Sequence, residues 1–274
     1  MPRGERTAVT RASGGRRGGS RVELPGVGAL RYSRRRLSGQ AWRVVEAQHV
    51  VSTRKLVDDL DEQELLEELI DGVKPPLPAD EVDHGRLHWL LATPFRYPPL
   101  RYGSRFGRRH ERGIWYGSLA VPTALAETAY YRLVFLEGTA ADLSLQVELT
   151  VFSAAYDSAR AVDLTRPPFD RHIARISSPI DYTVSQALGT AMREQDVELL
   201  RFRSARDPRG GDNLALLSPR ALATRRPGRQ ETWMCHASRP RVDFVRMNLA
   251  ARRATLSFPR SVFEVGGRLP SPAT

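Results

Sequence analysis

Residues 104–137, SRFGRRHERGIWYGSLAVPTALAETAYYRLVFLE, contain the changes of pattern that decide the fold. The first ten residues form a cationic loop with four arginines and one glutamate; such a loop either grips phosphate groups or is simply solvated. Residues 114–116 (IWY) are typical of a short strand. Pro122 favours the first turn of a helix, where its fixed φ fits and its missing N–H is not needed. The stretch therefore predicts a loop, a strand and a helix in succession.

The predicted helix is apolar on two sides. One stripe is formed by Leu125, Ala129, Leu133 and Leu136, and a second runs through Tyr130, Tyr131 and Val134. Glu127 lies on the second, partly aromatic stripe, where a carboxylate is expensive to bury unless it is paired or used. Two interpretations stay open: an ion pair with one of the many arginines, or an active-site carboxylate beside aromatic rings.

Outward from this stretch, strands and helices mix without a regular βαβα rhythm. The alternation of DLSLQVELTVF predicts a strand over 142–152, and apolar spacing predicts a helix over 183–195 with a capping box of Thr183 and Gln186. Further strands are expected at 197–202, 214–217, 242–247 and 261–265. The order predicts a mixed α/β or α+β domain over about 40–265, which we assign to the α+β class.

The net charge of +11 looks like a nucleic-acid signal, but most of it sits in residues 1–37, which carry ten arginines and two glutamates. Lysine is almost absent, with two residues against 40 arginines, which fits a GC-rich coding bias better than selection for phosphate binding. We therefore expect no direct nucleic-acid binding. An acidic helix is predicted over 58–71; its charged face either docks a basic partner or is solvated.

Other classes of protein are disfavoured by what the sequence lacks. No apolar run approaches the about 18 residues that a membrane helix needs, and a single cysteine, Cys235, excludes an intrachain disulfide. We expect a cytoplasmic protein with no membrane contact. The sequence also has no metal-ligand cluster, phosphate loop or dinucleotide fingerprint, so we expect neither a metal nor a bound cofactor.

A second candidate site lies at 203–213, RSARDPRGGDN. It follows a predicted strand and contains Ser204, Arg206, Asp207 and a Gly-Gly pair. Functional groups often lie on such loops, although a plain turn is the simpler interpretation.

These segments together resemble the RES domain, a family named for Arg, Glu and Ser. The first family motif is matched by SRF (104–106), Gly113, IWYG (114–117) and TALAETAYYR (123–132), and the second by LLRFRSARDP (199–208) followed by DNLALLSP (212–219). The segments AWRVVEAQHVVSTRKLVD, KPPLP and LLATPFRYP also look like the front half of one RES subgroup, so the resemblance spans about 41–225.

The resemblance implies which residues form the site. Arg105 would be the family arginine, Tyr116 the tyrosine, Glu127 the glutamate and Ser204 the serine. The gap from Arg105 to Gly113 is longer than the family usually has, so Arg108 and Arg96 are reserve candidates for binding the substrate or a phosphate.

The resemblance also implies an organisation and an activity. It implies a helical N-terminal part (38–90) and a RES catalytic core (91–265) similar in fold to ADP-ribosyltransferases, followed by a C-terminal tail (266–274). Residues 1–37 lie outside the resemblance, and their Arg/Gly-rich composition without periodicity predicts a disordered tail. RES proteins are typically toxins that break the nicotinamide–ribose bond of NAD⁺ with water or inorganic phosphate. NAD⁺ would be a substrate, and no cofactor would be needed.

The implied partner is an antitoxin of the Xre type, with a helix-turn-helix part, in a toxin–antitoxin hetero-oligomer. Two other interpretations of the sequence stay open. One is transfer of ADP-ribose to a macromolecule, and the other is a catalytically silent binding module.

Overall fold

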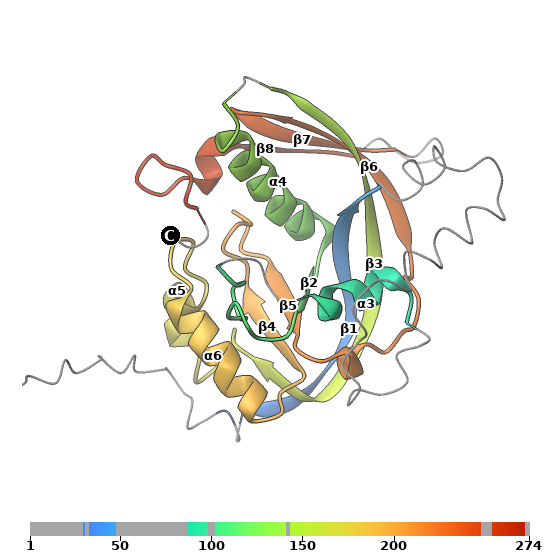
Figure 1. Cartoon of the computed structure of the whole chain (residues 1–274), viewed down its shortest axis with the longest axis vertical. Helices are drawn as coiled ribbons and strands as arrows, with labels where there is room; N and C mark the ends of the chain where they lie inside the picture. Colours follow the sequence, from blue (N-terminus) through green and yellow to red (C-terminus); the bar gives the residue numbers. More distant parts are fainter. Residues whose placement is uncertain are drawn as a thin grey trace, which may run out of the picture.

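Eight strands form one sheet, and part of it closes on itself (Figure 1). The computed structural model describes residues 30, 33–47, 87–97, 102–140, 143–247 and 254–271, and its strands lie in the order β1-β2-β5-β4-β3-β6-β7-β8. An additional pairing of β1 with β3 joins the first five of these into a ring. The strands are β1 (Arg34–Glu46), β2 (Trp115–Ser118), β3 (Leu145–Asp163), β4 (Leu199–Arg203), β5 (Asp212–Leu216), β6 (Gln230–Ser238), β7 (Arg241–Arg246) and β8 (Thr255–Pro259).

Helices pack against this sheet and complete the core. Within the described residues they are α3 (Trp89–Arg96), α4 (Val121–Glu137), α5 (Ile173–Ile176) and α6 (Thr183–Glu194), with the 3₁₀-helices η3 (Asp170–His172), η4 (Pro219–Ala221) and η5 (Arg260–Phe263). Helix α4 contacts β1, β2 and β5 as well as β6, β7 and β8. The α+β class expected from the sequence is confirmed.

Strand β3 is the longest element and organises the sheet. It pairs antiparallel with β1 and β6 and parallel with β4. The predicted alternation over 142–152 forms its first half, where Leu149 and Val151 are buried under α4. The strand continues to Asp163 because β1 supplies a partner along almost this whole second half, which has no strong alternation of its own.

Three groups of buried side chains fill the space between sheet and helices. One lies between α4 and β3, β6 and β7; the second is covered by α6, and the third by α3. The first predicted stripe of α4, including Leu125, Ala129 and Leu133, is buried in the first group. In the second stripe, Val134 is half-buried and Tyr131 is exposed. The cavity described below lies beside the first half of this helix.

The N-terminal boundaries expected from the sequence are wrong. Residues 34–46 are the strand β1 rather than the end of a disordered tail and the start of a helical part. Ala41 is the one buried residue of this strand and the others are exposed or half-buried, so it lacks the apolar alternation that would have predicted it, and its long ladder with β3 holds it in place. The predicted acidic helix over 58–71 lies outside the described residues.

Three local predictions are also corrected. Residues 260–263 form η5 rather than a strand, because β8 ends at Pro259, which has no N–H for the ladder. Helix α6 begins without a capping box; the Gln186 side chain instead donates to the carbonyls of Tyr102 and Ser104. The predicted C-terminal tail is docked as far as Pro270, whose carbonyl accepts a hydrogen bond from the Tyr130 hydroxyl.

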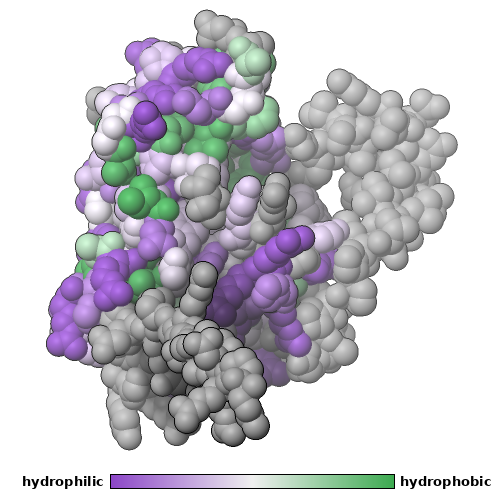
Figure 2. All heavy atoms as spheres, turned by 60° about the vertical axis from the view of Figure 1, so that its left-hand side comes forward, coloured by the Kyte–Doolittle hydropathy of each residue, from purple (hydrophilic) through white to green (hydrophobic). Residues whose placement is uncertain are grey.

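The surface is polar with local apolar groups. On the face drawn in Figure 2, apolar residues gather mainly in the upper half. The exposed apolar side chains of the described residues include Tyr131 and Phe135 of α4. None of the described helices has both the length and the hydropathy to cross a membrane.

Candidate active site

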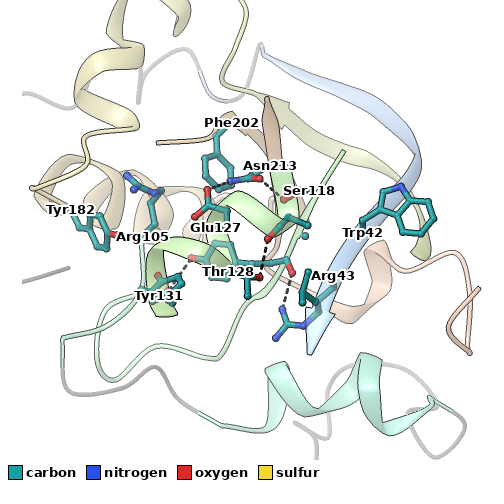
Figure 3. A pocket seen from close by; sticks show the side chains of 15 residues that line it. Trp42, Arg43, Arg105, Ser118, Glu127, Thr128, Tyr131, Tyr182, Phe202 and Asn213 are labelled. Atoms are coloured by element: carbon teal, nitrogen blue, oxygen red, sulfur yellow. Dashed lines mark hydrogen bonds between the residues drawn. The ribbon is translucent and has the colours of Figure 1, made fainter. Parts of the chain in front are cut away.

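A cavity of about 330 Å³ opens between α4 and the strands β1, β2 and β5 (Figure 3). Three of the four predicted site residues, Arg105, Tyr116 and Glu127, line it, and the fourth, Ser204, bonds to Glu127 from behind. The wall is completed by side chains that are mostly aromatic, small or hydroxylated: Trp42, Arg43, Val44, Ser104, Gly117, Ser118, Ala124, Thr128, Tyr131, Tyr182, Phe202 and Asn213.

Glu127 projects from the second turn of α4, and two donors hold one of its two oxygens. Ser204 Oγ and Asn213 Nδ2 both donate to Oε1, each at 2.6 Å. Among the described residues, no arginine forms an ion pair with this carboxylate, and Oε2 has no protein donor. The ion-pair interpretation of Glu127 is therefore not what the structure shows. Its free oxygen is available to a ligand in the cavity.

The hydroxyl of Ser204 has a defined direction. The backbone N–H groups of Arg206 and Asp207 donate to Ser204 Oγ at 3.1 and 3.0 Å. With both lone pairs occupied in this way, the hydroxyl hydrogen is left for Glu127. The second predicted site is thus a turn after β4 that aims one donor at the carboxylate.

This turn is also tied to the start of α4. Asp207 Oδ2 accepts from Thr123 Oγ1 at 2.7 Å, and Oδ1 accepts from the Arg209 N–H at 3.0 Å. Burial alone would raise the pKa of Asp207. The hydrogen bonds from Thr123 and Arg209 lower it by more than burial raises it, so the pKa lies below its usual value. The contact fixes Ser204 relative to the helix that carries Glu127.

Tyr116 lies on β2 and fixes the loop of the family arginine. Its hydroxyl accepts from the Phe106 N–H at 3.0 Å and shares a hydrogen bond of 2.9 Å with Ser104 Oγ. Burial raises the pKa of Tyr116 to about 12. The ring packs edge-on against Phe202. Tyr116 therefore holds the backbone on both sides of Arg105.

Arg105 is held at one end of the cavity. Its Nη1 donates to the Ser178 carbonyl at 2.8 Å, and its guanidinium lies 4.4 Å from the centroid of the Tyr182 ring. Gly103 allows the turn before it with φ +78°, and Gly189 lets α6 approach the loop so closely that a Cβ would lie 2.0 Å from the Phe106 carbonyl. The other N–H groups of Arg105 remain able to bind an anion.

Arg43 was missed as a site residue from the sequence. It lines the cavity from β1, donates to the Tyr116 carbonyl at 2.7 Å, and leaves its buried Nε without a partner among the described residues. Burial lowers the pKa of Arg43 to about 10, which still leaves it charged at neutral pH. In the view of Figure 3, Glu127 lies between Arg105 and Arg43. The only sequence signal was its place in the segment AWRVV.

Arg206, named earlier only as part of a loop, is buried behind the site. Its guanidinium lies 3.5 Å from the centroid of the Tyr130 ring and donates to the Pro179 carbonyl at 2.8 Å. Arg206 and Arg105 thus hold neighbouring carbonyls of the segment that leads to Tyr182. The two reserve arginines are not brought to the cavity: Arg96 ends α3, and Arg108 is exposed on the loop.

This arrangement suits a ligand with both flat rings and negative charge. Aromatic side chains can cover a planar ring, and two guanidinium groups can hold anionic groups. A carboxylate between them stabilises positive charge that develops on a bound molecule. Within the described ranges, no three His, Cys, Asp or Glu residues come together as a metal site would require.

A known family model agrees with the sequence motifs. No protein with a curated description matches the chain. A solved structure, the M. tuberculosis MbcT–MbcA toxin–antitoxin complex, contains a similar chain with 12% sequence identity and a TM-score of 0.45, covering 77% of this chain and 92% of that one. The model of the RES domain matches residues 79–238, which is more than half of the sequence. The chain therefore belongs to the RES domain family.

Proposed function

We propose that this protein cleaves the bond between nicotinamide and ribose in NAD⁺ and passes the ADP-ribosyl group to inorganic phosphate or water. Membership of the RES family supports this class of reaction. The observation that carries the proposal is Glu127, whose Oε1 is fixed by two donors while Oε2 is free in a cavity with two arginines.

The chemistry needs a fixed negative charge at one point. When the bond breaks, nicotinamide leaves as a neutral molecule with the bonding electron pair, and positive charge builds on the ribose ring, as in glycoside hydrolysis. The carboxylate of Glu127 stabilises that charge without having to reorganise. A water or phosphate oxygen then bonds to the ribose carbon. With water as the acceptor, one proton is lost to Glu127 or to solvent.

The two arginines give the substrate its orientation. NAD⁺ carries a pyrophosphate, and a guanidinium is well suited to bind it through paired hydrogen bonds. Arg105 and Arg43 lie on either side of Glu127 in Figure 3, so one can hold the pyrophosphate and the other an attacking phosphate. Tyr182 and Tyr131 offer rings on which nicotinamide can stack.

We also propose that the enzyme acts as a toxin in the cytoplasm, where NAD⁺ is available, and that an antitoxin of the Xre type restrains it in a hetero-oligomer. Family membership supports this partner. Co-expression with an Xre-type protein encoded by the adjacent gene tests this partnership. We expect a co-purified complex without NAD⁺ turnover. Independent purification of both proteins with full activity would contradict the partnership.

The reaction itself is tested with NAD⁺ labelled in the adenosine half. Label on phosphorylated ADP-ribose identifies phosphorolysis, and label on ADP-ribose that is indifferent to phosphate identifies hydrolysis. Label on protein or nucleic acid would identify transfer to a macromolecule, and intact NAD⁺ would contradict the proposal. The same assay is run on the variant Glu127→Gln, which lacks the carboxylate. Its matched control is Glu137→Gln, which lies ten residues along the same helix and outside the cavity.

A further inference from the structure

A series of hydrogen-bonded polar side chains on the neighbouring strands β2 and β5 leads to Glu127. Ser118 Oγ donates to Asn213 Oδ1 at 2.7 Å, and Asn213 Nδ2 donates to Glu127 Oε1 at 2.6 Å. We propose that Asn213, oriented by Ser118, is a positioning residue that fixes the Glu127 carboxylate and so sets the rate of bond cleavage; this rests on the proposed function.

The sheet places this series more rigidly than a loop could. Asn213 is directly opposite Ser118 in the β2–β5 ladder and opposite Phe202 in the β4–β5 ladder. Asn213 is 4% exposed and Ser118 3% exposed. Both side chains are therefore fixed by two paired strands, and the donor reaches Glu127 from a direction that does not depend on the Ser204 turn.

Glu127 and Ser118 together fix the Asn213 amide. The amide has an acceptor oxygen and a donor nitrogen of nearly equal size. If it turned over, its oxygen would face Oε1, and two acceptors would repel each other, so the nitrogen points to Glu127. The Ser118 hydroxyl then donates to the amide oxygen and holds the amide from its other end. Buried charge-assisted hydrogen bonds of this kind are the strong ones.

Both donors on Oε1 also keep their protons at every working pH, since an amide and a serine hydroxyl do not titrate there. The charged or titratable side chains around Glu127 come from α4, the Arg105 loop, the segment before α6 and the strands β1 and β2: Tyr130, Tyr131, Arg105, Tyr182, Arg43 and Tyr116. Burial raises the pKa of Tyr116 and of Tyr130 to about 12 and lowers that of Arg43 to about 10. These three groups therefore hold their charge state between about pH 5.5 and 8.5.

The test replaces the donor in two ways. Asn213→Ala removes it, and we expect kcat to fall about 10- to 100-fold with KM within about threefold, because a hydrogen bond to a charged group is lost at the reacting carboxylate. Asn213→Asp keeps the shape but supplies a donor only when the new carboxyl is protonated. Its kcat relative to Asn213→Ala should therefore rise as the pH falls towards 5.5.

Controls separate positioning from damage to the sheet. Leu216→Val lies on the same strand, does not line the cavity, and should lower stability while keeping kcat. If Asn213→Ala does not fold, Ser118→Ala replaces it, with a smaller loss of kcat because the amide remains but loses the hydrogen bond that holds its oxygen.

The outcomes are distinct. If Asn213→Ala keeps kcat within twofold of the wild type, or if both Asn213 variants have parallel pH profiles, the inference is overturned. If the wild-type protein leaves NAD⁺ intact, the proposed function fails on its own account. Crystal structures of the wild type and Asn213→Ala then decide: the positioning claim stands if the Glu127 carboxylate turns away in the variant and falls if it keeps its place.

Discussion

Ser204→Ala removes the side chain on which the turn after β4 depends. The hydroxyl makes three hydrogen bonds: it donates to Glu127 and accepts from the N–H groups of Arg206 and Asp207. In the variant, the carboxylate loses a donor and two buried N–H groups lose their acceptor. Because Ser204 is 6% exposed, water can replace these partners only in part.

The loss in the free energy of unfolding caused by Ser204→Ala follows from these three hydrogen bonds. A hydrogen bond to a charged group contributes about 1.5–3 kcal/mol, and each unsatisfied buried donor costs about 1–3 kcal/mol. Taking the lower part of these ranges, because water can enter from the cavity, we expect a loss of about 3–5 kcal/mol in the free energy of unfolding. That is a large part of the stability of a domain.

Urea unfolding followed by circular dichroism measures this loss, with Ser177→Ala as the matched control. Ser177 is also a buried serine, but among the described residues its hydroxyl makes one hydrogen bond, a donation to the Arg203 carbonyl at 2.7 Å. That variant should lose about 1 kcal/mol. A loss for Ser204→Ala no greater than that for Ser177→Ala would refute the assigned hydrogen-bond network.

Three further predictions address the site and its surroundings. Arg105→Ala should raise KM for NAD⁺ at least tenfold, because it removes a cation from the cavity wall; an unchanged KM in steady-state kinetics would contradict this. Cys235 is buried and burial raises its pKa to about 11, so a thiol reagent at pH 8 should label it only after unfolding; rapid labelling of the folded protein would contradict the core packing. The pKa of Asp207 is lowered by folding, so its stabilisation is present above about pH 4 and is lost as the pH falls through its folded pKa. The stability gap between the wild type and Asp207→Asn should therefore narrow in acid, and a gap that is constant with pH in urea titrations would exclude this contribution.

The sequence predicted the elements with strong periodicity. Helix α4, helix α6 and the first half of β3 each have an apolar pattern whose period matches the element, and all three form where expected. Strand β1 was missed because its residues show no apolar alternation and its stability comes from pairing with β3, which is over one hundred residues away. The sequence pattern within a strand contains no information about a pairing partner so far along the chain.

The site was predicted in the same uneven way. Motif resemblance named Arg105, Tyr116, Glu127 and Ser204, and the structure brings these four together. Asn213 lies within the second motif, directly before the apolar run LALL, but nothing local shows that β5 aligns it with Ser118 and aims it at α4.

For Tyr116 the sequence predicted a place in the site but not the partners of its hydroxyl. The resemblance named Tyr116 as a site residue, and in the structure its hydroxyl is already bonded to Ser104 and Phe106. Its ring still lines the cavity. Whether a hydroxyl bonds to a ligand or to neighbouring residues depends on what the fold places nearby, and sequence spacing does not contain that information.

In the proposed reaction, the Glu127 carboxylate stabilises the positive charge that builds on the ribose as the nicotinamide–ribose bond breaks. The most direct measurement is a single-turnover assay in which folded protein is in excess over NAD⁺ and released nicotinamide is followed, for the wild type and Glu127→Gln. The account predicts one nicotinamide per NAD⁺ with the wild type and a release at least about 100-fold slower with Glu127→Gln, whose ADP-ribose affinity stays within about threefold. Equal release rates from the two proteins would contradict it.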